Sequence, residues 1–485
     1  MLQRDSMSTR AGATISSVKP PLRIGYLPLY VDYYEGICPD FPREKGEVAL
    51  RCAGVLKEFG ELLWDGELIR DVEGASAAGR RFAAQQADCI VVLPTIAVFA
   101  GIPWAALEHR RKPVLIWNAQ QIQTVGAGYT MLEIVRNTGQ IGTQALANTL
   151  FRHGHWFRVI TGYEYSQETG YELSRFFRIL RVVQTLKTAR LLAIGDPFPL
   201  MTDILLDENT LARCTGATVA RVSIEELTRH YCGVSQEQIA AHIGRLREQH
   251  RVEDISVEEL ERSVRLCEAV QGLVERHEAT AGSLNCHGTV CLRNPSIGIT
   301  ACYSLGVQNQ LGRPFTCTGD LCTAVALLLL KDLTGVAMYT EVQVMDEVRG
   351  ALVIANSGEG EDKIRHVGSI STVRGNTNFA GLHGRGASFS YPLRAGPATI
   401  VSFTPGPNSE RPFRLIVAEG DILDEPLSDA GALAGFFRFQ TGDLRTGYRR
   451  WLEAGAVHHA ATTIGHWATD LIAIGQLLEI DVVVV

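Results

Sequence analysis

The sequence predicts an α/β protein with two doubly wound α/β domains followed by a mainly β C-terminal domain. Short apolar runs alternate with helical patterns from about residue 22, and a second such series begins near Arg190. After about Leu333, strands separated by Gly/Pro turns replace this alternation. Alternating elements indicate parallel sheets with helices on their faces. We therefore expect domains at residues 21–180, 181–332 and 333–485, after a disordered leader over residues 1–20.

The first predicted domain has a βαβ order of elements. Leu22–Leu27, Cys89–Leu93 and Pro113–Trp117 are compact apolar runs bounded by Pro, Asp or polar residues, as in buried parallel strands. Helical patterns at Glu44–Phe59 and Ser76–Gln86 lie between the first two runs. Ligands of such sheets bind beyond the carboxyl ends of the strands, so the polar residues after each strand are candidates for binding.

The second predicted domain begins with two strands, Arg190–Ile194 and Thr218–Val222. Three capping boxes then predict helix starts: Ser223 with Glu226, Ser235 with Gln238, and Ser256 with Glu259. A further strand is expected at Gly282–Asn285, after a long helix.

The third predicted domain is rich in strands. Val336–Val344, Ala351–Ala355, Ala398–Phe403 and Phe413–Val417 are apolar and separated by Gly/Pro turns. Thr469–Val485 is typical of a helix that runs into a final strand.

Composition argues against several classes of function. The net charge is −7, whereas a surface for nucleic acid needs an excess of Lys and Arg. The longest apolar run, Ala324–Leu330, is far shorter than the roughly 20 residues that cross a bilayer. The 11 cysteines are scattered and form no paired CxxC motif, which is typical of reduced thiols. We expect a cytoplasmic protein with no nucleic-acid or membrane partner.

Carboxylates and imidazoles recur around the start of the third domain. Pro314–Asp320 leads into an apolar helix, Glu341 follows on a strand, and Asn356–Glu359 comes next. His458 and His459 lie far downstream. Carboxylate and imidazole together suit a divalent cation that polarises a substrate oxygen.

Each of these residues also has a purely structural interpretation. Asp320 stands where a helix begins and is equally well explained as an N-cap. A His-His pair is more often structural than metal-binding. Glu341 is harder to explain structurally, because a carboxylate buried in an apolar strand needs a partner or a metal.

A series of segments across the chain resembles a known family in order and spacing. They are Trp117–Gln121, Arg136–Gly139, Val159–Gly162, Gly319-Asp320, Leu333–Gly335, Tyr391–Thr399, Val417–Gly420, Trp451–Gly455 with His458-His459, and Leu477–Val484. Together they resemble the L-fucose isomerase and L-arabinose isomerase family from about residue 22 to the end. The resemblance implies that family's fold.

The resemblance implies an aldose–ketose isomerase. In that family a divalent metal, usually Mn²⁺, holds two neighbouring sugar oxygens while two acids move a proton through a cis-enediol. The second acid falls on Glu341, and the ligand histidine falls on His459, with His458 beside it. The first acid falls on Thr318, and the third-strand histidine falls close to Asn356. Two of the family's positions therefore depart from its pattern.

Threonine cannot act as a carboxylate base and is a poor metal ligand, so another residue would have to compensate. Asp320, His287 and Glu359 are the candidates. The expected catalytic residues are Glu341 and Asp320, and the expected metal ligands are Glu341 and His459.

The resemblance also implies a homo-oligomer, a trimer or hexamer, with the sugar site between subunits. Part of that site would come from the first domain of a neighbour. The expected substrate-binding residues are Asn118, Gln120, Gln121, Met201, Thr318, Asn356 and His458.

Three hypotheses on function follow. The first is a metal-dependent ketol-isomerase acting on a pentose, a deoxyhexose or a modified sugar. The second keeps the fold and the site but changes the reaction, to epimerisation or carbon–carbon cleavage, because Thr318 replaces an acid. The third is a protein that binds sugars without catalysis.

Overall fold

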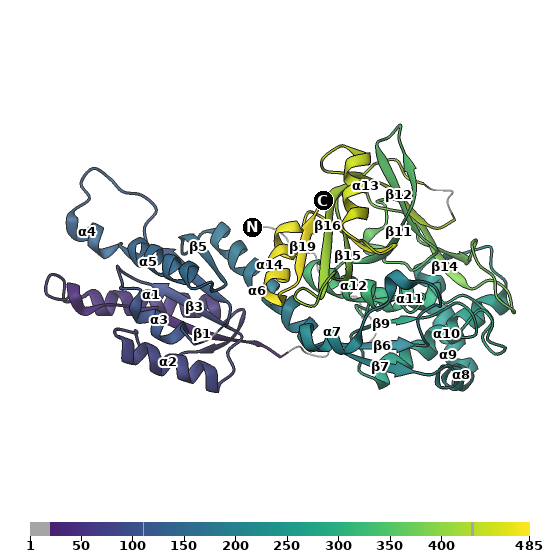
Figure 1. Ribbon diagram of the computed structural model, residues 1–485, viewed down its shortest axis with the longest axis horizontal. Coiled ribbons are helices and arrows are strands. Elements are labelled where there is room, and N and C mark those ends of the chain that lie inside the picture. Colours follow the sequence, from purple (N-terminus) through teal and green to yellow (C-terminus); the bar gives the residue numbers. More distant parts are fainter. Residues whose placement is uncertain (1–19, 110, 428–430) are drawn as a thin grey trace. The chain divides into compact units, whose positions relative to one another are not determined.

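The structure is a computed structural model that describes residues 20–109, 111–427 and 431–485 (Figure 1). The predicted leader lies outside the described residues, apart from Pro20. The chain divides into an N-terminal unit, residues 15–181, and a C-terminal unit that holds residues 182–485. The finer division of the C-terminal unit at residues 332/333 stays a prediction.

The N-terminal unit contains a five-stranded parallel sheet in the order β2-β1-β3-β4-β5. Its elements are β1 (Leu22–Leu29), η1 (Asp32–Tyr34), α1 (Phe41–Leu56), β2 (Gly60–Leu63), α2 (Val72–Ala84), β3 (Cys89–Pro94), α3 (Gly101–Leu107), β4 (Val114–Gln120), α4 (Met131–Arg136), α5 (Gly139–Arg152), β5 (Phe157–Tyr163) and α6 (Gln167–Lys187). The three predicted strands are confirmed as β1, β3 and β4, and the two predicted helices as α1 and α2. The edge strands β2 and β5 are too short or too polar to be recognised as apolar runs.

The C-terminal unit begins with a four-stranded parallel sheet in the order β10-β9-β6-β7. Its elements are β6 (Arg190–Ile194), η2 (Thr202–Ile204), α7 (Glu208–Thr215), β7 (Thr218–Val222), α8 (Ile224–Gly233), α9 (Gln236–Gln249), β8 (Arg251–Val252), α10 (Val257–Arg276), β9 (Ala281–Leu284), α11 (Cys302–Gln310) and β10 (Phe315–Thr316). The chain builds outward from β6 to β7 and then returns to the other side of β6 with β9. The direction of winding therefore reverses between β6 and β9.

Two of the three predicted capping boxes form in full, at Ser235 and Ser256. Ser223 also caps its helix by accepting from the backbone N–H of Glu226. The sequence signal was sufficient here because a cap depends on neighbouring residues alone.

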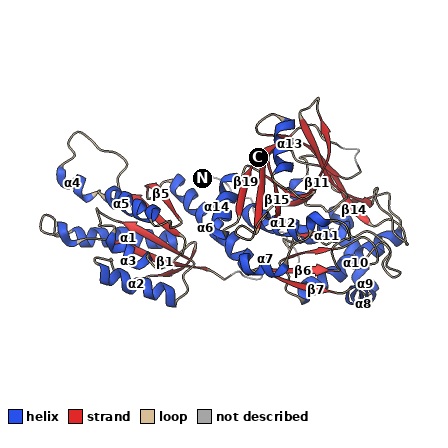
Figure 2. Ribbon diagram, in the orientation of Figure 1, coloured by secondary structure: helices blue, strands red, loops and turns tan. Residues whose placement is uncertain are grey.

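The rest of the C-terminal unit is rich in antiparallel strands. Its elements are α12 (Leu321–Thr334), β11 (Met338–Asp346), β12 (Ala351–Asn356), η3 (Asp362–Ile364), β13 (Thr372–Gly375), β14 (Ala387–Pro392), β15 (Gly396–Pro405), β16 (Phe413–Ile422), β17 (Leu433–Phe439), α13 (Leu444–Glu453), β18 (His459–Ile464), α14 (Ala468–Leu478) and β19 (Asp481–Val484). Six strands, in the order β16-β15-β18-β11-β12-β17, close into a ring because β17 also pairs with β16. The mixed α/β class and the β-rich C-terminal part are thus as the sequence predicts (Figure 2).

Helix α12 joins the second sheet to the ring of strands. Eleven of its 14 residues are buried, and it contacts β9 and β10 of the sheet as well as β15 and β18 of the ring. A helix that is apolar all round must be covered on all sides. Its N-terminus therefore has a fixed position relative to both sheets.

In the described part of the chain, helices that combine the length and the hydropathy needed to cross a bilayer are absent.

We predict that Gly282→Ala destabilises the C-terminal unit, whereas Gly272→Ala stabilises it. A Cβ at Gly282, in β9, would lie 2.3 Å from the carbonyl oxygen of Leu192 and 2.6 Å from the Phe315 ring. Such overpacking costs about 1–3 kcal/mol. Gly272 lies inside α10, where the nearest atom, in His230, is 3.8 Å from the added Cβ. Alanine there gains about 0.5–1 kcal/mol of helix propensity. Urea unfolding of both variants measures the difference in stability. Equal unfolding midpoints for the two variants would contradict the close packing around Gly282 in β9.

Candidate functional site

Loops that follow parallel strands of the C-terminal unit converge beside the N-terminus of α12. The backbone N–H of Phe198, after β6, donates to the carbonyl oxygen of Thr318, after β10, at 2.8 Å. Asn285 Nδ2, after β9, donates to the carbonyl oxygen of Asp196 at 2.7 Å. Since the winding reverses between β6 and β9, this carboxyl edge is where open α/β sheets bind ligands.

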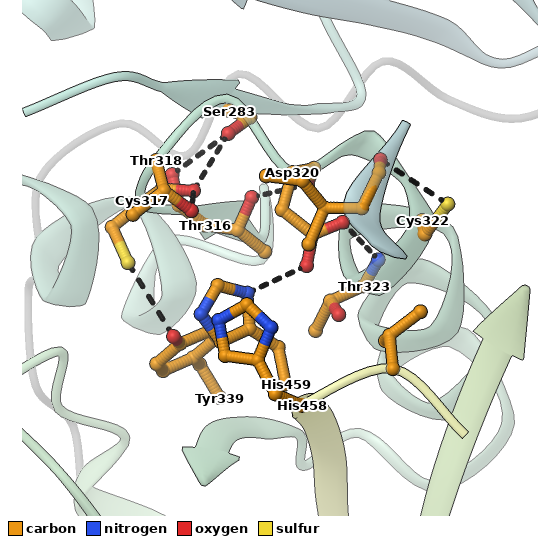
Figure 3. Close-up of polar contacts among 12 residues, drawn as sticks. Ser283, Thr316, Cys317, Thr318, Asp320, Cys322, Thr323, Tyr339, His458 and His459 are labelled. Atoms are coloured by element: carbon orange, nitrogen blue, oxygen red, sulfur yellow. Dashed lines mark hydrogen bonds and ion pairs between the residues drawn. The ribbon is translucent and has the colours of Figure 1, made fainter. Parts of the chain in front are cut away.

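Asp320 is the N-cap of α12 and also the partner of His459. Its Oδ1 accepts from the backbone N–H of Thr323 at 2.9 Å, and its Oδ2 accepts from His459 Nδ1 at 2.8 Å (Figure 3). Asp320 is 0% exposed and His459 is 1% exposed. A carboxylate accepts hydrogen bonds, so Nδ1 is the donor and Nε2 is left to face the site. The N-cap interpretation of Asp320 is confirmed, and the residue has this second contact besides.

Glu341 lies directly opposite His459 in the antiparallel pairing of β11 with β18. Opposed residues share one face of a sheet, and Glu341 Oε1 is 3.7 Å from His459 Nε2. Tyr339 donates its hydroxyl to Oε1 at 2.7 Å, and Gln343 Nε2 donates to Oε2 at 2.6 Å. Tyr339 and Gln343 were not predicted from the sequence. Their spacing of two from Glu341 could have identified them, because such residues lie on the same face of a strand.

The expectation that Glu341 is buried is wrong. Its side chain is 32% exposed. Burial along β11 falls off after Thr340, as the strand runs out from the core toward its hairpin. The carboxylate therefore keeps access to solvent while Tyr339 and Gln343 hold both of its oxygens.

His458 points to a different partner. Its Nδ1 is 2.6 Å from Asp203 Oδ2, and its backbone N–H donates to the same oxygen at 3.0 Å. The His458 and His459 rings lie 3.7 Å apart between centroids, as their overlap in Figure 3 illustrates. His458 thus anchors the η2 segment and covers one side of His459.

Thr318 is buried, and its hydroxyl donates to the carbonyl oxygen of the preceding residue, Cys317, at 2.8 Å. Its φ of +57° is unusual for a β-branched residue and costs about 1–3 kcal/mol. Such strain is commonly found at functional sites. The hydroxyl makes a local bond in its own turn.

Both the nitrogen and the oxygen of the Asn356 side-chain amide are hydrogen-bonded to nearby backbone groups. Nδ2 donates to the carbonyl oxygen of Tyr339 at 2.6 Å, and Oδ1 accepts from the backbone N–H groups of Gly358 and Glu359 at 2.7 and 2.9 Å. Asn356 therefore shapes the loop that carries Glu359, and its side chain has no group to spare for a ligand.

Glu359 is a second carboxyl group close to Glu341. It is 1% exposed, and its Oε2 has no hydrogen-bond partner among the described residues. Burial, followed by the nearby Cys317 and Glu341, raises the pKa of Glu359 well above its ordinary value. Burial therefore favours the protonated form of this carboxyl group.

His287 follows β9, at the point where the winding of the sheet reverses. Its ring lies between Phe198 and Phe379, with centroid separations of 5.2 and 5.3 Å, both edge-on. Burial lowers the pKa of His287, and the nearby Glu341 partly opposes that shift. His287 therefore lies near Glu341, and its neighbour Phe198 is held to the Thr318 turn by a backbone hydrogen bond.

The remaining predicted residues are on the loop after β6 and in the N-terminal unit. Met201 is partly exposed in the loop after β6, and its backbone N–H donates to the carbonyl oxygen of Phe198. Asn118, Gln120 and Gln121 lie in the N-terminal unit, at the carboxyl end of β4. Asn118 donates to Gln140, which in turn donates to Gln120.

Lys45, on α1, is a contact of Gln121 that the sequence did not reveal. Its Nζ donates to Gln121 Oε1 at 3.0 Å and to the carbonyl oxygen of Arg136 at 2.6 Å. The residue is 0% exposed, and burial lowers its pKa from 10.5 to about 8. A lone Lys in a helical pattern carries no sequence signal for such burial.

Comparison with known proteins yields no assignment. No family model matches the sequence, and no curated protein matches it. Among the residues that the structure describes, no three His, Cys, Asp or Glu side chains are grouped so as to hold a metal ion. The site is therefore defined by its own geometry, which is the contact of Asp320, His459 and Glu341.

We predict that Asp320→Asn reverses the tautomer of His459 without removing the helix cap. Asparagine caps helices as well as aspartate does, but its amide nitrogen would face His459 Nδ1 as a donor. Nδ1 then becomes an acceptor and the proton moves to Nε2. Nitrogen NMR of the histidine ring measures this, and a ring still protonated at Nδ1 would contradict the assigned contact. Asp320→Ala, which also loses the cap, should cost about 0.5–2 kcal/mol.

We predict that the stability of the N-terminal unit rises with pH between about 8 and 10.5 because of Lys45. In that window the unfolded chain still binds the proton and the folded one has released it, so folding is favoured as pH increases. Relative to Lys45→Met, the gain should reach about 3 kcal/mol, from a shift of roughly two and a half pH units. Urea unfolding of both proteins across this range tests it, and parallel stability curves would refute the burial of a charged Lys45.

Proposed function

We propose that this chain is a sugar ketol-isomerase-like enzyme that interconverts an aldose and a ketose through an enediol. The observation that carries the proposal is the pairing of Glu341 with His459, whose facing atoms are 3.7 Å apart while Asp320 holds the far side of the imidazole. The order of segments that resembles L-fucose and L-arabinose isomerases, and the fold that this family implies, support the same proposal.

The proposed reaction needs one base at carbon and one group that moves a hydroxyl proton. Glu341 is partly exposed and held by Tyr339 and Gln343, so it can take the proton from the carbon beside the carbonyl group. His459 Nε2 then moves the hydroxyl proton between the two neighbouring oxygens. Asp320 acts as a positioning residue, since it fixes which imidazole nitrogen faces the substrate.

The resemblance also implies bound Mn²⁺, and the residues present do not fit it well. Glu341 and His459 are suitable donors, but the Thr318 hydroxyl is bonded to its own turn and the Asn356 amide has no group to spare. Asp320 uses both oxygens on Thr323 and His459. His287 and Glu359 do not complete the set either, because no three His, Cys, Asp or Glu side chains among the described residues are grouped so as to hold a metal ion. The two remaining protein donors are fewer than a dedicated site for such a cation supplies. We therefore derive no step through a metal.

A second reaction deserves a test because one carboxylate is missing. Glu341 is partly exposed, whereas Asp320 and Glu359 are buried and Asp203 is held by His458. Epimerisation would use Glu341 to remove a proton from a sugar carbon and a second acid, or rotation of the intermediate, to return a proton to the opposite face of the same carbon. Carbon–carbon cleavage also needs one base on a hydroxyl group.

We predict that the protein catalyses deuterium entry at C1 or C2 of a pentose or a 6-deoxyhexose, and that Glu341→Gln lowers the rate by about 10³-fold. Proton NMR in D₂O, with a panel of these aldoses and their ketoses, measures the exchange. Glu347→Gln is the matched control, because Glu347 lies on the same hairpin in an exposed ion pair with Arg445.

The same NMR experiment separates the alternatives. It is run with added Mn²⁺ and after EDTA, and exchange that persists in EDTA is expected from the donor set. Exchange that returns only with Mn²⁺ would show that a metal binds here after all. Inversion at one carbon, or release of a shorter sugar, would replace isomerisation by epimerisation or cleavage. A protein that exchanges nothing would not be an isomerase.

A further inference from the structure

An aldose–ketose isomerase needs a group that withdraws charge from the substrate carbonyl, and none of Glu341, His459 and Asp320 has that role in the proposed reaction. The proton beside a carbonyl is very weakly acidic until the oxygen that gains charge is stabilised by a cation or by hydrogen-bond donors. Thr318 and Asn356 fall at or near ligand positions of the family that the sequence resembles. Their side chains instead donate hydrogen bonds to backbone carbonyl oxygens of this protein. A donor directed at the substrate is therefore required from elsewhere.

The two ring nitrogens of His287 are free to bind a ligand. Its backbone N–H donates to Asn285 Oδ1, but no hydrogen bond of the ring nitrogens is found among the described residues. The ring is only partly buried, whereas His459 nearby is wholly buried. A free imidazole at a carboxyl edge of a parallel sheet is placed to bind a ligand.

The surroundings of His287 fix its orientation. Phe198 and Phe379 contact the ring edge-on from two different loops, and neither competes for its nitrogens. The Phe198 loop is tied to Thr318, and the Phe379 loop is tied through Asn376 to the carbonyl oxygen of Ser357. Packing between aromatic side chains restricts rotation, which lowers the entropy lost when the ring donates to a ligand.

Burial also sets the protonation of this histidine. Its lowered pKa keeps the imidazole neutral at neutral pH, with one N–H donor and one acceptor nitrogen. A neutral imidazole is a good hydrogen-bond donor to an oxygen that is becoming an enediolate, and it does not neutralise the neighbouring Glu341 base.

We propose that His287 is a catalytic residue that donates its ring N–H to the carbonyl oxygen of the sugar while Glu341 removes the proton from the adjacent carbon. The electron pair of the C–H bond forms the new C=C bond, and the carbonyl pair moves onto the oxygen that His287 binds. His459 Nε2 takes the proton of the neighbouring hydroxyl group and delivers it to the oxygen that His287 binds, and the electron pair of that O–H bond forms the new C=O bond. Glu341 returns its proton to the former carbonyl carbon, so the product is an isomer and no oxidant or reductant is consumed. This inference rests on the proposed function.

The test compares His287→Phe, which keeps the aromatic packing and loses the donor, with His287→Gln, which keeps an N–H donor. His153→Phe is the matched control, because His153 also packs against an aromatic ring, although it is stacked on Trp104 of the N-terminal unit and not edge-on. Binding is measured by calorimetry in EDTA with four- and five-carbon aldonohydroxamates, which imitate the planar enediolate. Deuterium exchange and thermal unfolding are measured on the same samples.

We expect His287→Phe to weaken hydroxamate binding by about 10- to 100-fold, as for the loss of a hydrogen bond to a charged group. We expect kcat for exchange to fall by about 10²-fold or more, as on removing one donor to a developing oxyanion. KM should change little, His287→Gln should recover part of both losses, and the melting temperatures should agree with wild type. Equal hydroxamate affinity in wild type and His287→Phe, or no binding by wild type, overturns the inference.

The two proposals fail in different ways. If wild type exchanges deuterium, Glu341→Gln abolishes exchange and His287→Phe does not, the isomerase proposal stands and the role of His287 is refuted. If wild type exchanges nothing but binds a hydroxamate in a His287-dependent manner, the isomerase proposal fails while His287 remains a substrate-binding residue.

Discussion

The hydrogen bond between Asp320 and His459 is the contact on which the rest of the site depends. Both side chains are almost completely buried, so removing either one would leave its partner buried without a hydrogen bond and would lower the stability of the fold. The two oxygens of Asp320 serve different parts of the fold: one caps α12, and the other holds the first residue of β18. One carboxylate thus fixes the apolar helix and the ring of strands relative to each other, and fixes the imidazole as well.

Register in the ring then determines where the carboxylate of Glu341 lies. Because Glu341 is opposite His459 on adjacent antiparallel strands, locating the imidazole also locates the carboxylate. Burial falls steeply along this series, from 0% exposure at Asp320 and 1% at His459 to 32% at the Glu341 side chain. A buried, paired histidine next to a partly exposed carboxylate combines a rigid support with a group that a substrate can reach.

The sequence predicts well what depends on local pattern. The strands β1, β3, β4, β6 and β7 are apolar runs, and the capping boxes at Ser235 and Ser256 need only residues three apart. It predicts poorly what depends on distant contacts. The pairing of His458 with Asp203, across 255 positions, has no local signal, nor does the burial of Lys45. The exposure of Glu341 was misjudged because an apolar strand was assumed to be buried along its whole length, whereas β11 leaves the core midway.

Charge balance explains why threonine is compatible with position 318. The position is 2% exposed, and the adjacent Cys317 contacts the buried Glu359. Glu359 already resists ionisation because burial and Glu341 raise its pKa. Another carboxylate in this turn would add a buried negative charge that a proton or a bound cation would have to offset. Threonine adds no charge and satisfies its hydroxyl within the turn, which is consistent with the shortage of cation ligands around it. An isomerase site of the kind we propose would obtain from hydrogen-bond donors what a metal would otherwise supply, and the ring N–H of His287 is the donor that we propose.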